Sequence, residues 1–246
     1  EQASTIVLLR NIQEAQTILA YESRELAEEK EASSQFAELH FQLQDLNRKL
    51  EEQSLHDSLT GLWNRRYLYQ SIPRYVADIH RAYFGATFEK GESECVAFLM
   101  LDLDHFKQIN DTYGHEAGDQ VLCETARRLQ ETARTSDIVL RWGGEEFLVI
   151  GRNTTHAKAH LVANRVQECF RKSLFEIGGG KEIEITCSVG LACYPLVPQK
   201  CDALSWEDVL TVADEAMYAS KLSGRNQWVG LGGTEQTPID GFRESL

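Results

Sequence analysis

The sequence predicts an α+β fold, an α/β sandwich with helices packed on a central mixed sheet, preceded by one long helix. Three observations lead to this prediction. Residues 95–101 form a continuous apolar run, which is typical of a buried strand. Residues 138–142 and 147–150 are apolar runs on either side of Gly143-Gly144, the pattern of a β-hairpin. Apolar residues at helical spacing alternate with these strands along the chain.

Composition limits the classes of function. The 246 residues are 42% hydrophobic, enough for a substantial core in one or two domains. A formal net charge of −13 argues against a nucleic-acid partner, because such proteins usually present a basic face. The six cysteines include no C-x-x-C pair and most lie in apolar runs, so we expect reduced thiols and a cytoplasmic location. No apolar run reaches membrane-spanning length.

Residues 1–55 contain neither Pro nor Gly and are predicted to form one helix with coiled-coil spacing. Such a helix would extend for about 75 Å, longer than a single domain can cover, so we expect a parallel homodimer rather than an amphipathic helix folded on its own domain. The chain opens inside this helical pattern without Met, which suggests a piece of a longer protein. The predicted domains are residues 1–55 as the coiled coil, 56–230 as the folded domain and 231–246 as a disordered tail.

Further elements follow in order along the chain. A helix is expected from about Asn64 to Tyr83 with an interruption at Pro73, and residues 85–94 read as a polar loop. After the strand at 95–101, the periodicity predicts helices at 107–112 and 119–133, the hairpin, a helix at 154–173, one or two strands within 182–194, a helix at 205–222 and a short strand at 227–229. We expect disorder from Gly230 onwards.

Candidate chemistry lies at two strand ends. Asp102 follows the strand at 95–101, and Glu145-Glu146 follow the Gly-Gly turn, where the lack of a Cβ lets a bulky ligand approach. If the two strands are neighbours, Asp102 and Glu145 have the usual arrangement of carboxylates that hold Mg²⁺ on a nucleotide. The ordinary alternatives are a turn-capping aspartate and a solvated hairpin tip.

Polar residues around these acids suit a nucleotide. Lys107 can face phosphate, Asn110 offers an amide, and Asp119 can accept the paired N–H groups of a guanine edge. Lys221 and Arg225 place two cations at a helix end, where compensation of the helix dipole is the alternative explanation.

Six motifs in one order make residues 57–229 resemble a GGDEF diguanylate cyclase domain. They are D-x-L-T-G-L-x-N-R-R at 57–66, D-x-D-x-F-K-x-I-N-D at 102–111, G-H-x-x-G-D at 114–119, R-x-x-D at 134–137, GGEEF at 143–147 and K-x-x-G-R-N at 221–226. The resemblance implies a palm-like sheet similar to that of adenylyl cyclases and polymerases. It also implies condensation of two GTP molecules to cyclic di-GMP with release of two pyrophosphates.

Carried over position by position, the resemblance assigns roles to residues of this chain. Metal ligands for Mg²⁺, or Mn²⁺ in its place, would be Asp102, the Leu103 carbonyl and Glu145. Glu145 would also accept the 3′-hydroxyl proton, with Glu146 and Lys107 as further catalytic residues. The implied substrate-binding residues are Phe106, Asn110, His115, Asp119, Gly143, Gly144, Lys221 and Arg225. Arg134 and Asp137 resemble the family's inhibitory site for the product.

The resemblance also implies partners. One domain binds one GTP, so a second domain must face it, and the coiled coil would join the two and carry a signal from an upstream sensor that this chain lacks. The alternatives are a catalytically silent receptor for GTP or cyclic di-GMP and a purely structural dimeriser. The third motif letter is Glu rather than Asp, which active members of the family also use. The loop at 85–94 is longer than the family minimum.

Overall fold

The structure, a computed structural model, describes residues 55–83 and 94–233, together with Lys30, Ser33, Gln35, Phe36, residues 38–44 and Leu46. The chain divides into two compact units, Glu1–Gln53 and Ser54–Leu246. The described residues of the first unit are helical, and their large apolar side chains are exposed. Most of the predicted coiled coil and nearly all of the predicted loop at 85–94 lie outside the described residues. The parallel dimer therefore stays a prediction.

The second unit is built on a six-stranded sheet in the order β1-β3-β4-β2-β7-β8. The central strand β2 pairs antiparallel with β4 and β7, and the two edge pairs, β1 with β3 and β7 with β8, are parallel. The predicted mixed sheet is thus confirmed. The strands are β1 (Trp63–Asn64), β2 (Glu94–Leu103), β3 (Ile138–Gly143), β4 (Glu146–Thr155), β7 (Cys187–Tyr194) and β8 (Trp228–Leu231). A separate small pair joins β5 (Phe175–Glu176) to β6 (Glu182–Ile183).

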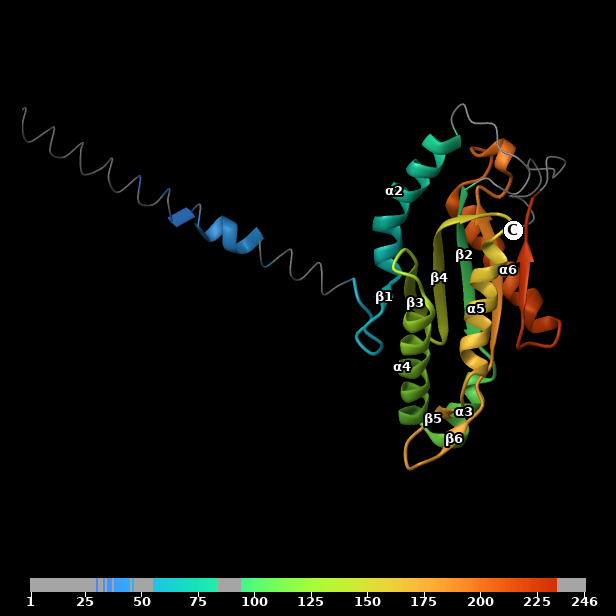
Figure 1. Ribbon diagram of the computed structural model, residues 1–246. Coiled ribbons are helices and arrows are strands. Elements are labelled where there is room, and N and C mark those ends of the chain that lie inside the picture. The colour runs from blue at the N-terminus through green and yellow to red at the C-terminus, as the bar shows by residue number, and fades with distance from the viewer. Residues whose placement is uncertain are drawn as a thin grey trace, which may run out of the picture. The chain divides into compact units, whose positions relative to one another are not determined.

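Helices cover both faces of this sheet (Figure 1). Side chains of β2 alternate between the faces, so Val96, Phe98 and Met100 pack in one core and Ala97, Leu99 and Leu101 in the other. The first core includes α2 (Arg65–Tyr83) and α6 (Trp206–Leu222); the second includes α3 (Phe106–Tyr113), α4 (His115–Thr132) and α5 (Ala159–Arg171). The short helix η1 (Pro198–Lys200) lies between β7 and α6. The layered α+β prediction is confirmed.

Four predicted details are wrong. The helix predicted from residue 119 begins at His115, because α3 ends before Gly114, which has a φ of 87°, and α4 follows directly. Pro73 lies inside α2 without interrupting it, because Leu68, Ile72 and Ile79 bury the helix against the sheet on both sides of the proline. The helix predicted from residue 154 begins at Ala159, since β4 continues until Thr155 pairs with Glu94. Gly230 and Leu231, predicted to be disordered, belong to β8 because they pair with Leu191 and Ala192 of β7. The rest of the predicted tail after Gly233 lies outside the described residues.

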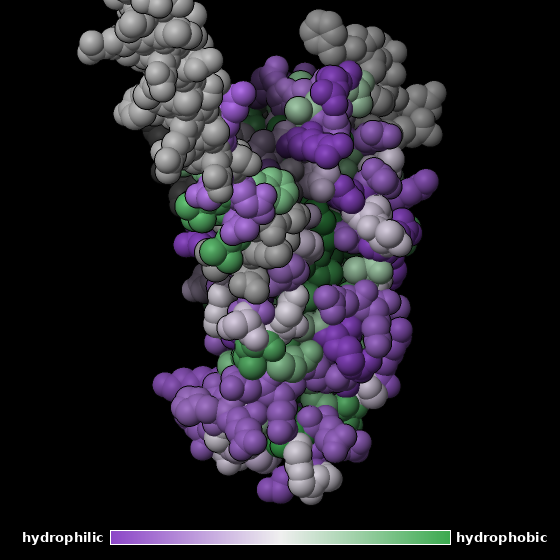
Figure 2. Space-filling model, turned by 90° about the vertical axis from the view of Figure 1, so that its left-hand side faces the viewer, coloured by the Kyte–Doolittle hydropathy of each residue, from purple (hydrophilic) through white to green (hydrophobic). Residues whose placement is uncertain are grey.

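The surface is mainly polar on the face seen in Figure 2, where hydrophobic residues form small separate patches among the coloured residues. Within the part of the chain that the structure describes, no helix combines the length and the apolar character needed to cross a membrane. All six cysteines are free, and four of them are buried.

Candidate active site

Acidic side chains gather at the end of the sheet from which α3 departs (Figure 1). Asp102, near the end of β2, lies opposite Glu146, the first residue of β4. The Leu103 amide donates to the Glu145 carbonyl over 3.4 Å. The structure therefore brings Asp102, Leu103, Glu145 and Glu146 together, because β2 and β4 are neighbours and the Gly-Gly turn ends beside Asp102.

These carboxyls hold protons more tightly than usual. Burial raises the pKa of Asp102, Glu145 and Glu146, and the charge of Asp102 raises the pKa of both glutamates further. Asp214 on α6 adds to the repulsion felt by Glu146. Such a group of carboxylates is stabilised by a cation.

A cation already stands beside this group. The Lys221 ammonium, at the end of α6, lies 2.8 Å from Asp102 Oδ2, and the charge of Arg225 also acts on Asp102. Oxygen donors with excess negative charge are the ligands that Mg²⁺ prefers. The oxygen donors present thus fit a divalent metal ion.

Sequence reasoning missed Asp104, which anchors this end of the domain. Its buried carboxylate accepts hydrogen bonds from Thr186 Oγ1 at 2.6 Å, Ser188 Oγ at 2.7 Å and the Asn226 amide at 3.0 Å. The last bond holds the turn in which Arg225 and Asn226 both have a positive φ. Asp104 therefore positions the loop that carries Arg225. The second acid of the D-x-D pattern was the available signal.

The corner between α3 and α4 holds an unpaired polar atom. Asn110 Oδ1 is buried without a hydrogen-bond partner. It packs against Gly118, where an added Cβ would lie only 2.0 Å from Asn110 Oδ1 and 3.2 Å from Phe106 Cζ. The next residue, Asp119, is exposed. A buried amide with an unmet bond beside an exposed carboxylate suits a ligand with both donors and acceptors.

Most of the other predicted site residues are accessible, whereas Phe106 is buried in the core that includes α3 and α4. Lys107 lies in the first turn of α3, His115 begins α4, and both are exposed. Gly143 and Gly144 are exposed at the β3–β4 turn, and a Cβ at either would meet nothing within 4 Å. This turn is therefore open to a bulky ligand.

Arg141 ties the hairpin turn to the first motif. Its guanidinium donates to the Gly144 carbonyl at 3.0 and 2.7 Å and to the Asp57 carboxylate at 3.1 Å. Burial alone would raise the pKa of Asp57, but hydrogen bonds from Thr60 and Arg141 outweigh it and lower that pKa. The turn is thus held in place by a residue that sequence reasoning did not single out.

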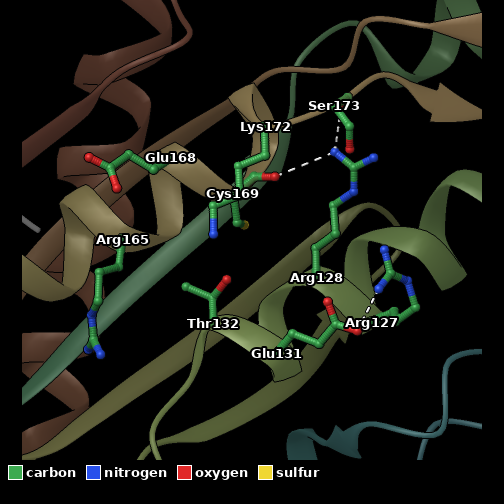
Figure 3. Close-up of a pocket in the computed structure, with 9 residues that line it drawn as sticks. All are labelled: Arg127, Arg128, Glu131, Thr132, Arg165, Glu168, Cys169, Lys172 and Ser173. Atoms are coloured by element: carbon green, nitrogen blue, oxygen red, sulfur yellow. Dashed lines mark hydrogen bonds and ion pairs between the residues drawn. The ribbon is translucent and has the colours of Figure 1, made fainter.

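The Arg134–Asp137 turn lies apart, before β3. Asp137 Oδ2 accepts from the Arg134 amide at 2.9 Å and from Arg165 of α5 at 3.4 Å. Arg165 also lines a cavity of about 460 Å³ between α4 and α5. Figure 3 shows Arg165 across the cavity from Arg127 and Arg128. These two cations are engaged by Glu124 and by other acceptors, Glu131 for Arg127 and the Ser173 carbonyl for Arg128.

One end of the mixed sheet thus combines carboxylates, two cations and an open glycine turn. The chain belongs to the family described as diguanylate cyclase, GGDEF domain, whose model matches residues 54–227. The resemblance noted from the motifs is thereby confirmed.

Named relatives share the same domain. The response regulator PleD of Caulobacter vibrioides is 39% identical over 180 residues, which are 73% of this chain and 36% of PleD. Diguanylate cyclase A of Treponema denticola is 37% identical over 184 residues, 74% of this chain and 45% of that protein. This chain thus spans less than half the length of either relative.

A solved structure agrees with the fold. The coiled coil and GGDEF domain of DgcB from Caulobacter crescentus, in complex with c-di-GMP, matches with a TM-score of 0.62 and 27% identity. The match covers 80% of this chain and 98% of that one.

Proposed function

We propose that this chain is a diguanylate cyclase that condenses two GTP molecules into cyclic di-GMP with release of two pyrophosphates, and that it does so with Mg²⁺ in the cytoplasm. The observation that carries the proposal is the carboxylate group around Asp102 with Lys221 at 2.8 Å, at the end of the sheet. The name of Diguanylate cyclase A and the c-di-GMP complex of DgcB support the same activity.

The chain's own residues provide for each step. Asp102, the Leu103 carbonyl and Glu145 would hold Mg²⁺, which when bound offsets charge on the phosphates. The 3′-oxygen of one GTP attacks the α-phosphorus of the other, its proton passes to Glu145 and pyrophosphate leaves; a second round closes the ring.

Binding and orientation fall to the surrounding residues. Lys107, Lys221 and Arg225 neutralise the triphosphate, and Glu146 stabilises the metal geometry. Asn110 and Asp119 hold guanine. Asn110 Oδ1 has no partner within the protein, so it can accept a hydrogen bond from an N–H group of the base. Phe106 and His115 lie beside this base, and Gly143 and Gly144 let the nucleotide lie against the turn.

Two domains must meet for each product, since one domain holds one GTP. We propose a homodimer through residues 1–55, controlled by a sensor upstream of this chain. Linking two domains raises their effective concentration, so a tether favours the productive encounter.

Pyrophosphate release from GTP and Mg²⁺ tests the activity, with cyclic di-GMP identified as the product. Asp102→Asn and Glu145→Gln should abolish release while circular dichroism stays native. Glu207→Gln, a charge-matched change at the opposite end of α6, should turn over normally. A wild-type chain that binds GTP without releasing pyrophosphate is the receptor alternative, and normal release by the two site variants would refute the assigned roles.

We also propose product inhibition at Arg134 and Asp137, with Arg165 as a third member. The specific observation is that Asp137 accepts from both Arg165 and the backbone amide of Arg134, and that Arg134 is exposed. Arginine pairs bind phosphate well because each guanidinium can donate two parallel hydrogen bonds.

A further inference from the structure

A second group of metal-binding side chains lies away from the carboxylates. His80 comes from the last turns of α2, and Cys201 and Asp202 follow η1. His80 Nδ1 is 3.0 Å from Asp202 Oδ1, and one ligand atom from each of the three residues lies within 4.8 Å of the others. The three kinds of ligand atom that Zn²⁺ binds in proteins, nitrogen, sulfur and oxygen, thus lie close together here.

This group is at the opposite end of the sheet from Asp102. His80 contacts Tyr194, which pairs with Val96 near the start of β2, whereas Asp102 pairs with Ser188. Six residues of strand separate Val96 from Asp102, which is roughly 20 Å at about 3.3 Å per residue. In Figure 1 the two places correspond to the free end of α2 and the α3 end of the sheet. The two sites are therefore independent.

A hydrogen-bond chain sets the orientation of the His80 ring. The Tyr194 hydroxyl donates to the Cys201 carbonyl over 3.4 Å. In the metal-bound form His80 would donate from Nε2–H to the Tyr194 oxygen, with which it makes a short contact. Nδ1 then carries the lone pair and faces Asp202. Metal-binding histidines have this arrangement, with the second ring nitrogen donating to a fixed partner.

We propose that His80, Cys201 and Asp202 bind a divalent transition metal of the Zn²⁺ class, with water in the fourth position. Ligands about 2.0–2.3 Å from Zn²⁺ lie about 3.3–3.6 Å apart in a tetrahedron. His80 and Asp202 atoms 3.0 Å apart, in a group that spans at most 4.8 Å, reach this spacing with an adjustment of about 1 Å. Asp202 can supply it, because its side chain is 80% exposed. On binding, the metal replaces the thiol proton of Cys201, which passes to solvent.

The donor types also separate this site from the other one. Sulfur and imidazole nitrogen favour Zn²⁺ and its neighbours over Mg²⁺, whereas the group around Asp102 offers only oxygen. The competing explanation is a plain ion pair between a protonated His80 and Asp202. That ion pair needs no thiol, so a change at Cys201 distinguishes the metal site from the ion pair.

The test uses the whole chain freed of metal by chelation, then titrated with Zn²⁺ in a large excess of Mg²⁺, which saturates the oxygen site. Calorimetry should give one strong Zn²⁺ site per chain and a rise in Tm on binding. Co²⁺ as a probe should develop a thiolate absorption band. His80→Ala and Cys201→Ser should each weaken Zn²⁺ binding by more than tenfold, and Tyr194→Phe by about tenfold.

Cys123→Ser is the matched control, since Cys123 is an exposed thiol elsewhere on α4. It should bind Zn²⁺ like the wild type. The proposal is overturned if the wild type takes up no Zn²⁺ under these conditions, or if Cys201→Ser retains wild-type affinity and the cobalt band. Cys201 lies in a loop and is only partly buried, so its serine variant tests the site even where His80→Ala misfolds.

Discussion

Replacing Gly118 by alanine should weaken GTP binding without weakening the fold. The added Cβ would lie 2.0 Å from Asn110 Oδ1, and real Cβ contacts stay above 3.0 Å, so that oxygen must move by about 1 Å. The severe clash falls on the end of the Asn110 side chain, which can turn away, and Phe106 Cζ at 3.2 Å has to shift by only a few tenths of an ångström. Alanine is also favoured over glycine inside a helix by about 1 kcal/mol. We therefore expect a Tm equal to or slightly above that of the wild type.

GTP binding should weaken even though stability is kept, because a displaced Asn110 amide can no longer hydrogen-bond to the guanine base. A lost hydrogen bond with a buried partner costs about 1–3 kcal/mol, which is about a 5- to 150-fold loss of affinity. Calorimetric titration with a non-reactive GTP analogue measures this change. Asn110→Ala should show a similar loss.

The double variant gives the sharpest outcome. If Gly118 acts through Asn110, then Gly118→Ala should cost almost nothing further once Asn110 is alanine. Fully additive losses, or wild-type affinity in Gly118→Ala, would refute the reasoning that this glycine makes room for the Asn110 amide.

Three further variants test other parts of the site. Asp104→Ala should lower the free energy of unfolding in urea by about 3–5 kcal/mol, since three bonds to a buried charge are lost, while Asp111→Ala, exposed on α3, should change it by less than about 0.5. Arg165→Ala should keep the initial rate of pyrophosphate release but remove the late slowing of the progress curve. The control Arg74→Ala, on α2, should slow like the wild type, and slowing that persists in Arg165→Ala would rule Arg165 out of inhibition. Glu146→Gln should raise the Tm of the metal-free protein at pH 7, because the raised pKa of Glu146 makes stability fall as pH rises above the ordinary glutamate value near 4.5; the gain should vanish at lower pH, and a gain that persists there would have another cause.

Local patterns made much of this architecture predictable. Gly143-Gly144 between two apolar runs predicts the hairpin, and the apolar run at 95–101 predicts a buried strand. The start of α6 is equally local, because Ser205 and Asp208 form a reciprocal capping box. Such signals depend on neighbours in sequence, so one chain suffices to read them.

Other features depend on partners far along the chain. Thr154 and Thr155 extend a strand because β2 is there to pair with them, although their surroundings favour a helix. Gly118 has no visible purpose in the sequence until Asn110 is placed against it. Arg165 likewise gains a role only when α5 brings it to Asp137. The placement of Asp102 beside Glu146 was foreseeable only on condition that their strands were neighbours.

The bonds of Asp104 have a consequence for protein synthesis. They join residues that are 82, 84 and 122 positions apart, and the last partner is Asn226, close to the end of the domain. A chain emerging from the ribosome at about 5–20 residues per second exposes Asp104 several seconds before that partner exists. During most of this interval the Arg225 loop has not yet been synthesised, so the nascent domain cannot assemble its proposed triphosphate site. The phosphate site can therefore form only after residues 221–226 have emerged, later than the acidic residues Asp102, Glu145 and Glu146.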